Sequence, residues 1–256
     1  MLRKIDHTHE FSYSLVRRYE EWLNSERDYN RFYGNSENSP IPDEYELGKK
    51  LEFYSSLFKL QFKPEFERDD TSLILGKVFE NALNNALSLS SNSEITVFEF
   101  INNKSESYNI VLNPDFITLV ENRKTNPPKQ QVEIKGILPN GLKFIGYSDE
   151  VYENCIIDIK TTSNFSKLNY DTSLQIPLYL HFINDYLIQR GFYQVTEFYR
   201  SKAIGKNEFL MKDTFMIECS HITESQLTVF SDLCMEILKN VSIFENDVEK
   251  YSNYFI

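Results

Sequence analysis

Cysteine is scarce in this sequence of 256 residues, which contains only Cys155, Cys219 and Cys234. An odd number of cysteines without a CxxC pair argues against a disulfide framework and against a zinc site built on cysteine pairs. An iron–sulfur cluster held within one chain needs four cysteine ligands, so we also expect no iron–sulfur cluster.

Long hydrophobic runs are missing as well. No segment approaches the ~18 consecutive apolar residues that indicate a membrane-spanning helix. The first 22 residues carry charges throughout, whereas a signal peptide is built around an apolar segment. We therefore expect a soluble, cytoplasmic protein with no membrane partner.

Positive charge is in deficit, because 27 Lys and Arg residues face 38 Asp and Glu residues and give a net charge of −11. This balance excludes a uniformly basic coat for nucleic acid, but it does not exclude a local basic groove. Acidic residues are also metal ligands, so the charge alone leaves a DNA enzyme open.

Several motifs that mark enzyme classes are absent from the sequence. It contains no HExxH, GxSxG, Walker A or GxGxxG pattern, which argues against zinc proteases, hydrolases of the nucleophile-elbow type, NTPases and Rossmann enzymes. A helicase motor, if the function requires one, must therefore come from a partner protein.

The hydrophobic pattern predicts a mixture of helices and strands. Apolar spacing predicts helices within residues 9–60, a helix over 75–87, a helix over 174–188 and a closing helix over 223–246. Strands are expected at residues 95–100, 131–138, 142–152, 155–162, 192–201 and 212–220, and Asn140-Gly141 marks a hairpin between the second and third of these.

This order of elements predicts an α/β (mixed α+β) fold with a central mixed sheet flanked by helices. We expect residues 1–70 to form an N-terminal helical extension packed on the core. Residues 71–205 would form the core itself, and residues 206–256 would add a strand and a helix to the same domain.

The strand over residues 155–162 contains the first candidate site residues. Side chains alternate along a strand, so Asp158 and Lys160 share one face with Ile156. Apolar residues on both faces indicate a central, covered strand, where an acid and a lysine lose hydration unless they are paired or bind a metal. Such groups mark either a functional site or a structural Asp–Lys ion pair, and spacing alone does not separate the two.

Asp149 is a second candidate, because it precedes Asp158 across a short turn at Glu153-Asn154. Two carboxylates at the end of one hairpin repel each other, and a divalent cation would relieve that repulsion. Oxygen ligands suit Mg²⁺ or Mn²⁺.

Three motifs in this part of the chain resemble those of a known family. Gly146-x-x-Asp149, Asp158-x-Lys160-Thr161-Thr162 and Gln175-x-x-x-Tyr179 are similar, in this order, to the motifs of the PD-(D/E)XK nuclease superfamily. The third motif resembles the RecB-like exonuclease branch. The resemblance covers roughly residues 72–200 and implies a restriction-endonuclease-like core.

The resemblance also implies roles for individual residues. Asp149, Asp158 and the Ile159 carbonyl would bind Mg²⁺ or Mn²⁺, and Lys160 would be the catalytic lysine. Glu80 would be a further metal ligand where related exonucleases carry a His or an acidic residue; the alternative is an ordinary exposed helix carboxylate. Gln175, Tyr179 and Thr161 would contact the substrate, although Gln175 and Tyr179 would equally serve to support the site or to pack the helix.

A competing version of the motif lies upstream, where Pro114-Asp115 precedes Glu133-Ile134-Lys135. In this segment polar and apolar residues alternate, which is typical of a half-exposed strand, and Glu133 and Lys135 then need no catalytic explanation. We therefore prefer Asp149, Asp158 and Lys160.

The resemblance implies a metal-dependent deoxyribonuclease, and its QxxxY motif favours an exonuclease acting on DNA ends or single strands. Recombination, repair or phage DNA metabolism would be its setting, with a helicase or recombination protein as partner. The alternative is a non-catalytic module of the same fold that binds nucleic acid or acts as a scaffold.

Overall fold

The computed structural model describes residues 5–6, 8–33, 41–63, 75–77, 79–80, 83, 94–101, 104–200 and 207–256. The chain divides into two compact units. One contains residues 1–67, 134–146 and 222–256, and the other contains residues 68–133 and 147–221. Packing of residues 1–70 on the core as part of a single domain stays a prediction.

The first unit is mainly helical. Its elements are β1 (Glu10–Phe11), α1 (Tyr13–Leu23), α2 (Ser25–Phe32), α3 (Pro42–Phe58), α8 (Glu224–Lys239), α9 (Val241–Lys250) and a 3₁₀ turn (Ser252–Tyr254). The helices expected within residues 9–60 are therefore confirmed. The single closing helix was wrong, because Asn240 separates α8 from α9: its side-chain amide donates to the Glu236 carbonyl and competes with the helical backbone.

The first unit has an aromatic core. Rings from α1, α3 and α9 lie with their centroids 5.0–6.0 Å apart, namely those of Tyr19, Trp22, Phe53 and Phe244. Most of these pairs meet edge to face or tilted, as aromatic rings prefer. Two tyrosine hydroxyls at the rim of this core donate hydrogen bonds to carboxylates, Tyr19 to Glu236 and Tyr54 to Asp247.

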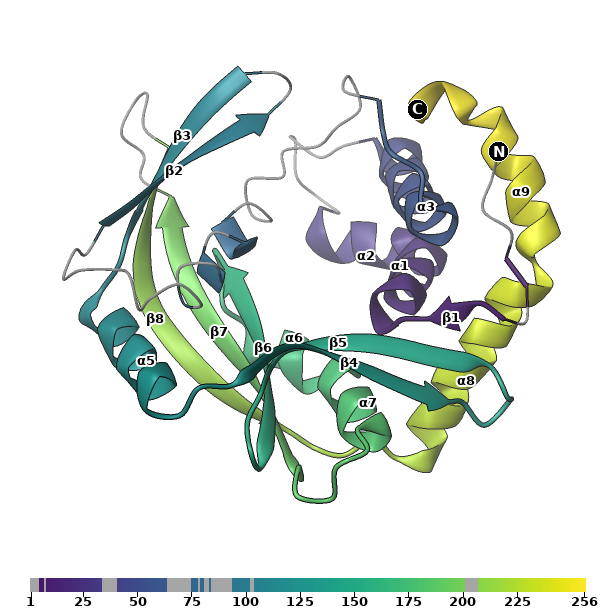
Figure 1. Ribbon diagram of the computed structural model, residues 1–256. Helices are drawn as coiled ribbons and strands as arrows, with labels where there is room; N and C mark the ends of the chain where they lie inside the picture. The colour runs from purple at the N-terminus through teal and green to yellow at the C-terminus, as the bar shows by residue number, and fades with distance from the viewer. Residues whose placement is uncertain are drawn as a thin grey trace. The chain divides into compact units, whose positions relative to one another are not determined.

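The second unit is built around a mixed β-sheet, as expected. Its elements are β2 (Glu94–Ile101), β3 (Lys104–Val111), α5 (Pro114–Thr125), β6 (Cys155–Thr162), α6 (Lys167–Asp171), α7 (Gln175–Phe182), β7 (Arg190–Arg200) and β8 (Asn207–Cys219), with parts of β4 (Lys129–Ile137) and β5 (Lys143–Val151). The strand order is β5-β6-β7-β8-β3-β2. Pairs β6–β7 and β3–β8 are parallel and the others antiparallel; β6, β7 and β8 are adjacent ribbons in Figure 1.

The predicted hairpin between β4 and β5 is confirmed. Gly141 adopts a left-handed φ of 85°, and the Asn140 side chain accepts the Leu142 N–H inside the turn. The strand at β6 is also confirmed, with the expected tight turn before it: the Tyr152 N–H donates to the Cys155 carbonyl at 2.8 Å.

The helix after β6 is shorter than expected. Helix α7 ends at Phe182, because Asp185 forms a turn in which its carboxylate accepts the Leu187 N–H. Gly191 lies in β7 (Arg190–Arg200). A Cβ there would come within 2.3 Å of Ile176, so glycine is what allows α7 to pack against the strand.

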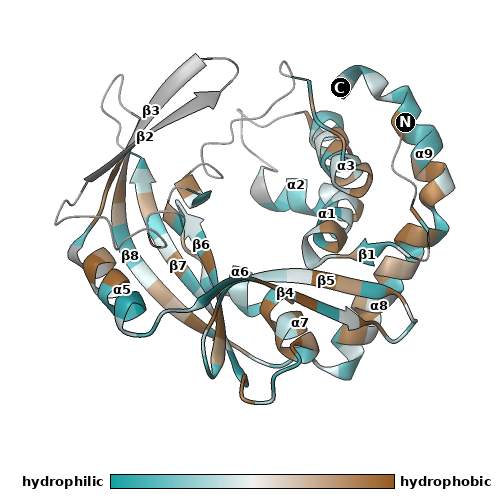
Figure 2. Cartoon of the chain, viewed as in Figure 1, coloured by the Kyte–Doolittle hydropathy of each residue, from teal (hydrophilic) through white to brown (hydrophobic). Residues whose placement is uncertain are grey.

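Helices cover both faces of this sheet. Helix α7 packs on the face that carries Ile156 and Gly191. The opposite face packs against α5 and the helical residues around Phe79, in a cluster that includes Leu75, Phe79, Leu83, Phe116, Val120, Ile159 and Phe198. Figure 2 shows brown, hydrophobic residues on both β7 and β8, interrupted by teal, hydrophilic ones. The predicted helix positions beyond Leu83 lie outside the described residues.

Among the described residues, every helix is too short or too polar to cross a lipid bilayer.

Candidate active site

The candidate site lies where strands β5 and β6 separate. Their pairing consists of Glu150 with Ile157 and Val151 with Ile156, so Asp149 and Asp158 come next, opposite each other. The Asp149 carboxylate replaces the missing ladder partner, since its Oδ2 accepts the Ile159 N–H at 2.7 Å. The N–H and C=O of one strand residue point to the same side, so the Ile159 carbonyl also points toward this gap.

Asp158 is 1% exposed. Its Oδ1 accepts a hydrogen bond from Gln175 Nε2 at 2.8 Å, whereas its buried Oδ2 accepts no hydrogen bond of good geometry. Lys160 Nζ forms an ion pair with this Oδ2 at 2.5 Å. Burial raises the pKa of Asp158 to about 6; the positive charge of Lys160 opposes this shift, and the negative charges of Asp149 and Glu80 add to it.

Lys160 balances part of this negative charge. Burial is the largest single effect and lowers the pKa of Lys160, but the charge and hydrogen bond of Asp158, together with the charge of Asp149, outweigh it, so the pKa is raised. The lysine is therefore fully protonated at neutral pH. Its side chain keeps 37% of its surface exposed, so a substrate can reach it.

Glu80 joins the same group of charges through a glutamine. Its Oε1 accepts a hydrogen bond from Gln131 Nε2 at 2.8 Å, and the same nitrogen lies 3.2 Å from Asp149 Oδ1. Burial raises the pKa of Glu80, and the Asp149 charge raises it further, while the Gln131 hydrogen bond opposes the shift. Glu80 is thus half-buried beside Asp149 rather than an isolated carboxylate in solvent.

Helix α7 places the QxxxY pair against this site. Gln175 Nε2 lies 2.8 Å from Asp158 Oδ1 and 3.1 Å from the Tyr179 hydroxyl. Burial and the Asp158 charge raise the pKa of Tyr179 to about 12, so the phenol stays neutral. In this structure Gln175 orients a site carboxylate; contact of Gln175 and Tyr179 with a substrate stays a prediction.

Thr161 follows Lys160 in β6 and lies beside the helical residues that carry Glu80. A Cβ added to Gly76 would come 3.2 Å from Thr161 Oγ1, so this glycine allows the helix to approach the strand closely. Substrate contact by Thr161 also stays a prediction.

The residues fit a divalent cation in their chemistry. Asp149, Asp158, Glu80 and the Ile159 carbonyl offer only oxygen atoms, and Asp158 Oδ2 is a buried acceptor without a hydrogen bond. In the described part of the chain, however, no three acidic, histidine or cysteine side chains lie close enough together to hold a metal as they stand. Gln131 and Lys160 take up the space and the charge between the acids instead.

The residues of the competing upstream motif, Pro114-Asp115 and Glu133-Ile134-Lys135, show no comparable cluster of contacts among the described side chains. Glu133 is exposed and accepts a hydrogen bond from the Tyr147 hydroxyl at 2.9 Å, as expected of a half-exposed strand residue. Pro114 begins helix α5.

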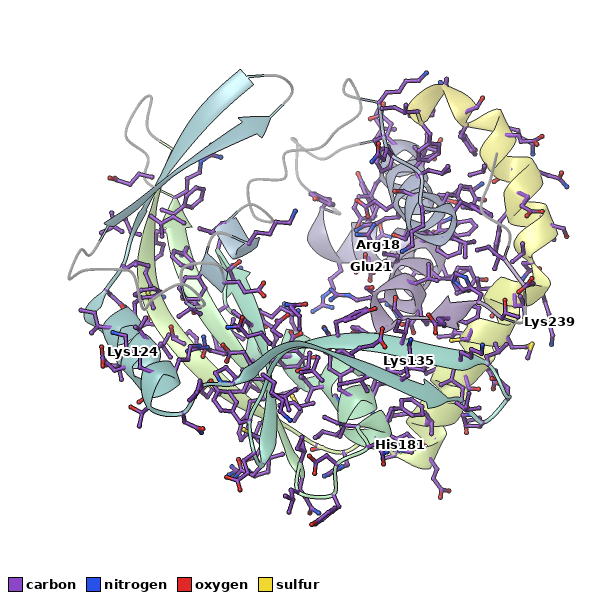
Figure 3. All side chains as sticks on the ribbon, in the orientation of Figure 1. Arg18, Glu21, Lys124, Lys135, His181 and Lys239 are labelled. Carbon is purple, nitrogen blue, oxygen red and sulfur yellow. The ribbon has the colours of Figure 1, made fainter. Side chains whose placement is uncertain are left out.

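A second polar group lies on the opposite face of the sheet, and sequence reasoning missed it. Arg123 of α5 binds Glu150 through two hydrogen bonds of 2.6 and 2.9 Å, and Tyr152 and Gln194 complete the group at 3.0 and 3.1 Å. Lys124 and His181, labelled in Figure 3, mark the last turns of α5 and α7, the helices that supply Arg123 and Gln175.

This chain matches no family model, and no curated protein matches its sequence. Among solved structures it is similar to SSO0001, with 13% identity, a TM-score of 0.43 and coverage of 92% of this chain and 78% of that one. It is also similar to a "putative exonuclease" from Eubacterium rectale, with 15% identity, a TM-score of 0.34 and coverage of 88% and 82%. At these values neither likeness identifies a function.

Proposed function

We propose that this chain is a metal-dependent DNA nuclease that hydrolyses phosphodiester bonds. The observation that carries the proposal is Asp158, a carboxylate that is 1% exposed, has one oxygen without a hydrogen bond, and lies beside Lys160. Asp149 lies next to it across the separating strands. Burying such a group is costly, and a strongly perturbed acid in this setting is typical of a functional site.

Mg²⁺ or Mn²⁺ is the proposed cofactor. Asp149 and Asp158 would hold it, with Glu80 and the Ile159 carbonyl as further oxygen ligands. When bound, a divalent cation supplies a Lewis acid for the phosphate and lowers the pKa of a bound water.

The protein's own side chains would orient the metal ligands, stabilise charge and bind the substrate. Gln175 fixes the orientation of Asp158 through its 2.8 Å hydrogen bond. Lys160 holds a positive charge 2.5 Å from Asp158, where it would stabilise negative charge that develops on the phosphate. The neutral Tyr179 hydroxyl would offer a hydrogen bond to the DNA backbone.

The finer part of the proposal is exonuclease action on DNA ends or single strands, in the cytoplasm. It is supported by the resemblance of the Gln175–Tyr179 motif to the RecB-like branch. Recombination, repair or phage DNA metabolism would be the setting, with a helicase or recombination protein as partner.

The test is digestion of end-labelled linear DNA, single- and double-stranded, beside a covalently closed circle, with Mg²⁺, Mn²⁺ or EDTA. We expect metal-dependent loss of the linear substrates only. Asp158→Ala and Lys160→Ala should each lose at least about 100-fold in rate, while Glu133→Ala, a matched acid on the neighbouring strand, should keep full activity. An active Asp158→Ala beside an inactive Glu133→Ala would overturn the assignment of the site.

The alternative is a non-catalytic module that binds nucleic acid or acts as a scaffold. The observation that favours it is the Gln131 amide between Glu80 and Asp149, since hydrogen bonds then hold the acids together without a cation. A protein that neither cleaves DNA nor binds Mn²⁺ would support this alternative.

A further inference from the structure

Tyr147 is an exposed tyrosine on the strand that carries Asp149. It keeps 48% of its surface exposed and lies two residues before Asp149 in β5. Side chains two residues apart in a strand point to the same face, about 6.8 Å from each other along the strand. The ring of Tyr147 therefore lies on the face of β5 that carries the candidate site.

Contacts across the β4–β5 hairpin agree with this placement. Gln131 Nε2 of β4 lies 3.2 Å from Asp149 Oδ1. Two residues further along each strand, the Tyr147 hydroxyl donates a hydrogen bond to Glu133 at 2.9 Å, so the two pairs follow one another on one face of the hairpin. The backbone of Tyr147 also forms a hydrogen bond with the Tyr179 hydroxyl. Tyr147 is thus a direct neighbour of the candidate site.

The ring of Tyr147 presents an aromatic surface to solvent beside charged groups. Its contact with Glu133 is made by the hydroxyl, at the edge of the ring, whereas stacking uses the flat face. Two other tyrosines are exposed in the described part of the chain, but Tyr199 lies under Lys212, with Nζ 5.3 Å from its ring centroid, and Tyr186 lies in the turn after α7. Among the three, Tyr147 is the one beside the acids.

An exposed aromatic ring next to an exposed lysine fits an unpaired nucleotide. Lys160 exposes 37% of its side chain and would attract a backbone phosphate. The ring of Tyr147 would stack on a base, since every base has a flat π-face. In a duplex the base faces are covered by the neighbouring base pairs, so bases that are unstacked and unpaired are the ones that reach an aromatic side chain.

We propose that Tyr147 is a substrate-binding residue that stacks on a base of single-stranded DNA whose backbone passes Lys160. This inference rests on the proposed function and names the form of DNA that the site prefers. The Gly146-x-x-Asp149 motif leaves position 147 open, so the stacking residue is a feature of this chain. The competing role is structural, with Tyr147 only as the cross-strand neighbour of Glu133.

Fluorescence polarisation with two labelled oligonucleotides tests this role. One is oligo(dT), and the other is a strand of the same length with abasic sites in place of the bases. Both are titrated in EDTA at one low salt concentration, so that cleavage is prevented and the contribution of the phosphates is the same for both. We expect the wild type to bind oligo(dT) at least about fivefold more tightly than the abasic strand.

Tyr147→Leu keeps an apolar side chain but removes the ring. It should weaken the binding of oligo(dT) by about fivefold or more and bind the abasic strand as the wild type does. Tyr147→Phe keeps the ring without the hydroxyl and should restore the preference for oligo(dT). Tyr186→Leu, the same change at an exposed tyrosine beyond the end of α7, should change neither affinity.

Circular dichroism would verify that each variant is folded. A loss of equal size on both strands in Tyr147→Leu would show a structural disturbance rather than a lost stacking contact. That result, or unchanged binding of both strands, would overturn the stacking role and leave Tyr147 as the cross-strand neighbour of Glu133.

Digestion of single-stranded DNA with Mg²⁺ or Mn²⁺ separates this inference from the proposed function. Tyr147→Leu should raise KM with little change in kcat, because stacking holds the substrate and the transition state alike. If the wild type digests DNA and Tyr147→Leu binds both strands as the wild type does, only the role of Tyr147 fails. If the wild type prefers oligo(dT) but digests no DNA, the stacking role holds and the nuclease fails. If the wild type neither binds nor digests DNA, both fail.

Discussion

Asp149 and Glu150 are consecutive residues of β5, so their side chains point to opposite faces of the sheet. The carboxylates on the two faces differ in how far hydrogen bonds satisfy them. Both Glu150 oxygens accept hydrogen bonds, from Arg123 and Tyr152. On the other face, Asp158 Oδ2 is ion-paired with Lys160 but accepts no hydrogen bond of good geometry. Burial raises the pKa of Asp158, and the charges of neighbouring acids add to the shift. A buried charge alone is therefore no sign of function; a buried charge left partly unsatisfied among like charges is the stronger sign.

The largest effect on stability is expected from breaking the satisfied face. Arg123→Met leaves Glu150 buried and unpaired, which should lower the free energy of unfolding by about 3–5 kcal/mol. Urea denaturation measures this loss. The double variant Arg123→Met, Glu150→Leu should recover part of it, because it removes the unpaired charge as well. A loss below about 1 kcal/mol in the single variant would show that the Arg123–Glu150 pair is not the structural support we describe.

At the candidate site we expect the opposite effect: removal of a buried charge should stabilise the protein. The pKa of Asp158 is about 6 in the folded protein against 3.8 ordinarily, so the folded state holds more protons between pH 4 and 6, and stability falls as pH rises through that window. Asp158→Asn removes this dependence. In EDTA it should be more stable than the wild type above pH 6, by about 1–3 kcal/mol, with no difference below pH 4.

Thermal unfolding across pH 3.5–8 measures this difference. An Asp158→Asn variant that is less stable than the wild type at pH 8 would mean that the ion pair with Lys160 satisfies the carboxylate, and the contrast between the two faces would disappear.

The smallest effect is expected at the ends of strands β7 and β8. Arg190 and Glu218 pair β7 with β8 at 2.7 Å, but more than half of each side chain is exposed. Exposed ion pairs contribute little to stability, so Arg190→Met should leave the urea midpoint nearly unchanged. A loss as large as that of Arg123→Met would show that burial does not decide the value of these pairs.

Much of the fold follows from local patterns. The period of two and the Asn140-Gly141 turn predicted β4, β5 and β6. The turn at Glu153-Asn154 predicted that Asp149 lies near Asp158, and in the structure Asp149 accepts the N–H of Ile159, the next residue. Helix α5 was missed because no clear apolar period marks residues 101–130, and Arg123 was missed with it. The helix after β6 was predicted too long, because the chain turns at Asp185 and the spacing of apolar residues does not indicate that turn.

The position of the Gln131 side chain between Glu80 and Asp149 could not be predicted from the sequence. The alternating pattern of residues 131–135 predicts that Gln131 is an ordinary polar residue on the exposed side of a strand. No residue type near it indicates a left-handed backbone. Only the folded chain brings β4 and the helical residue Glu80, 51 positions apart, to one nitrogen atom.

The central claim is that the unsatisfied face of β5 and β6 binds a divalent cation, and Mn²⁺ titration of the metal-free protein tests it most directly. We expect the wild type and Glu133→Gln to bind Mn²⁺ with the same affinity, and Asp158→Asn to lose that binding. No Mn²⁺ binding by the wild type, or unchanged binding by Asp158→Asn, would contradict the claim.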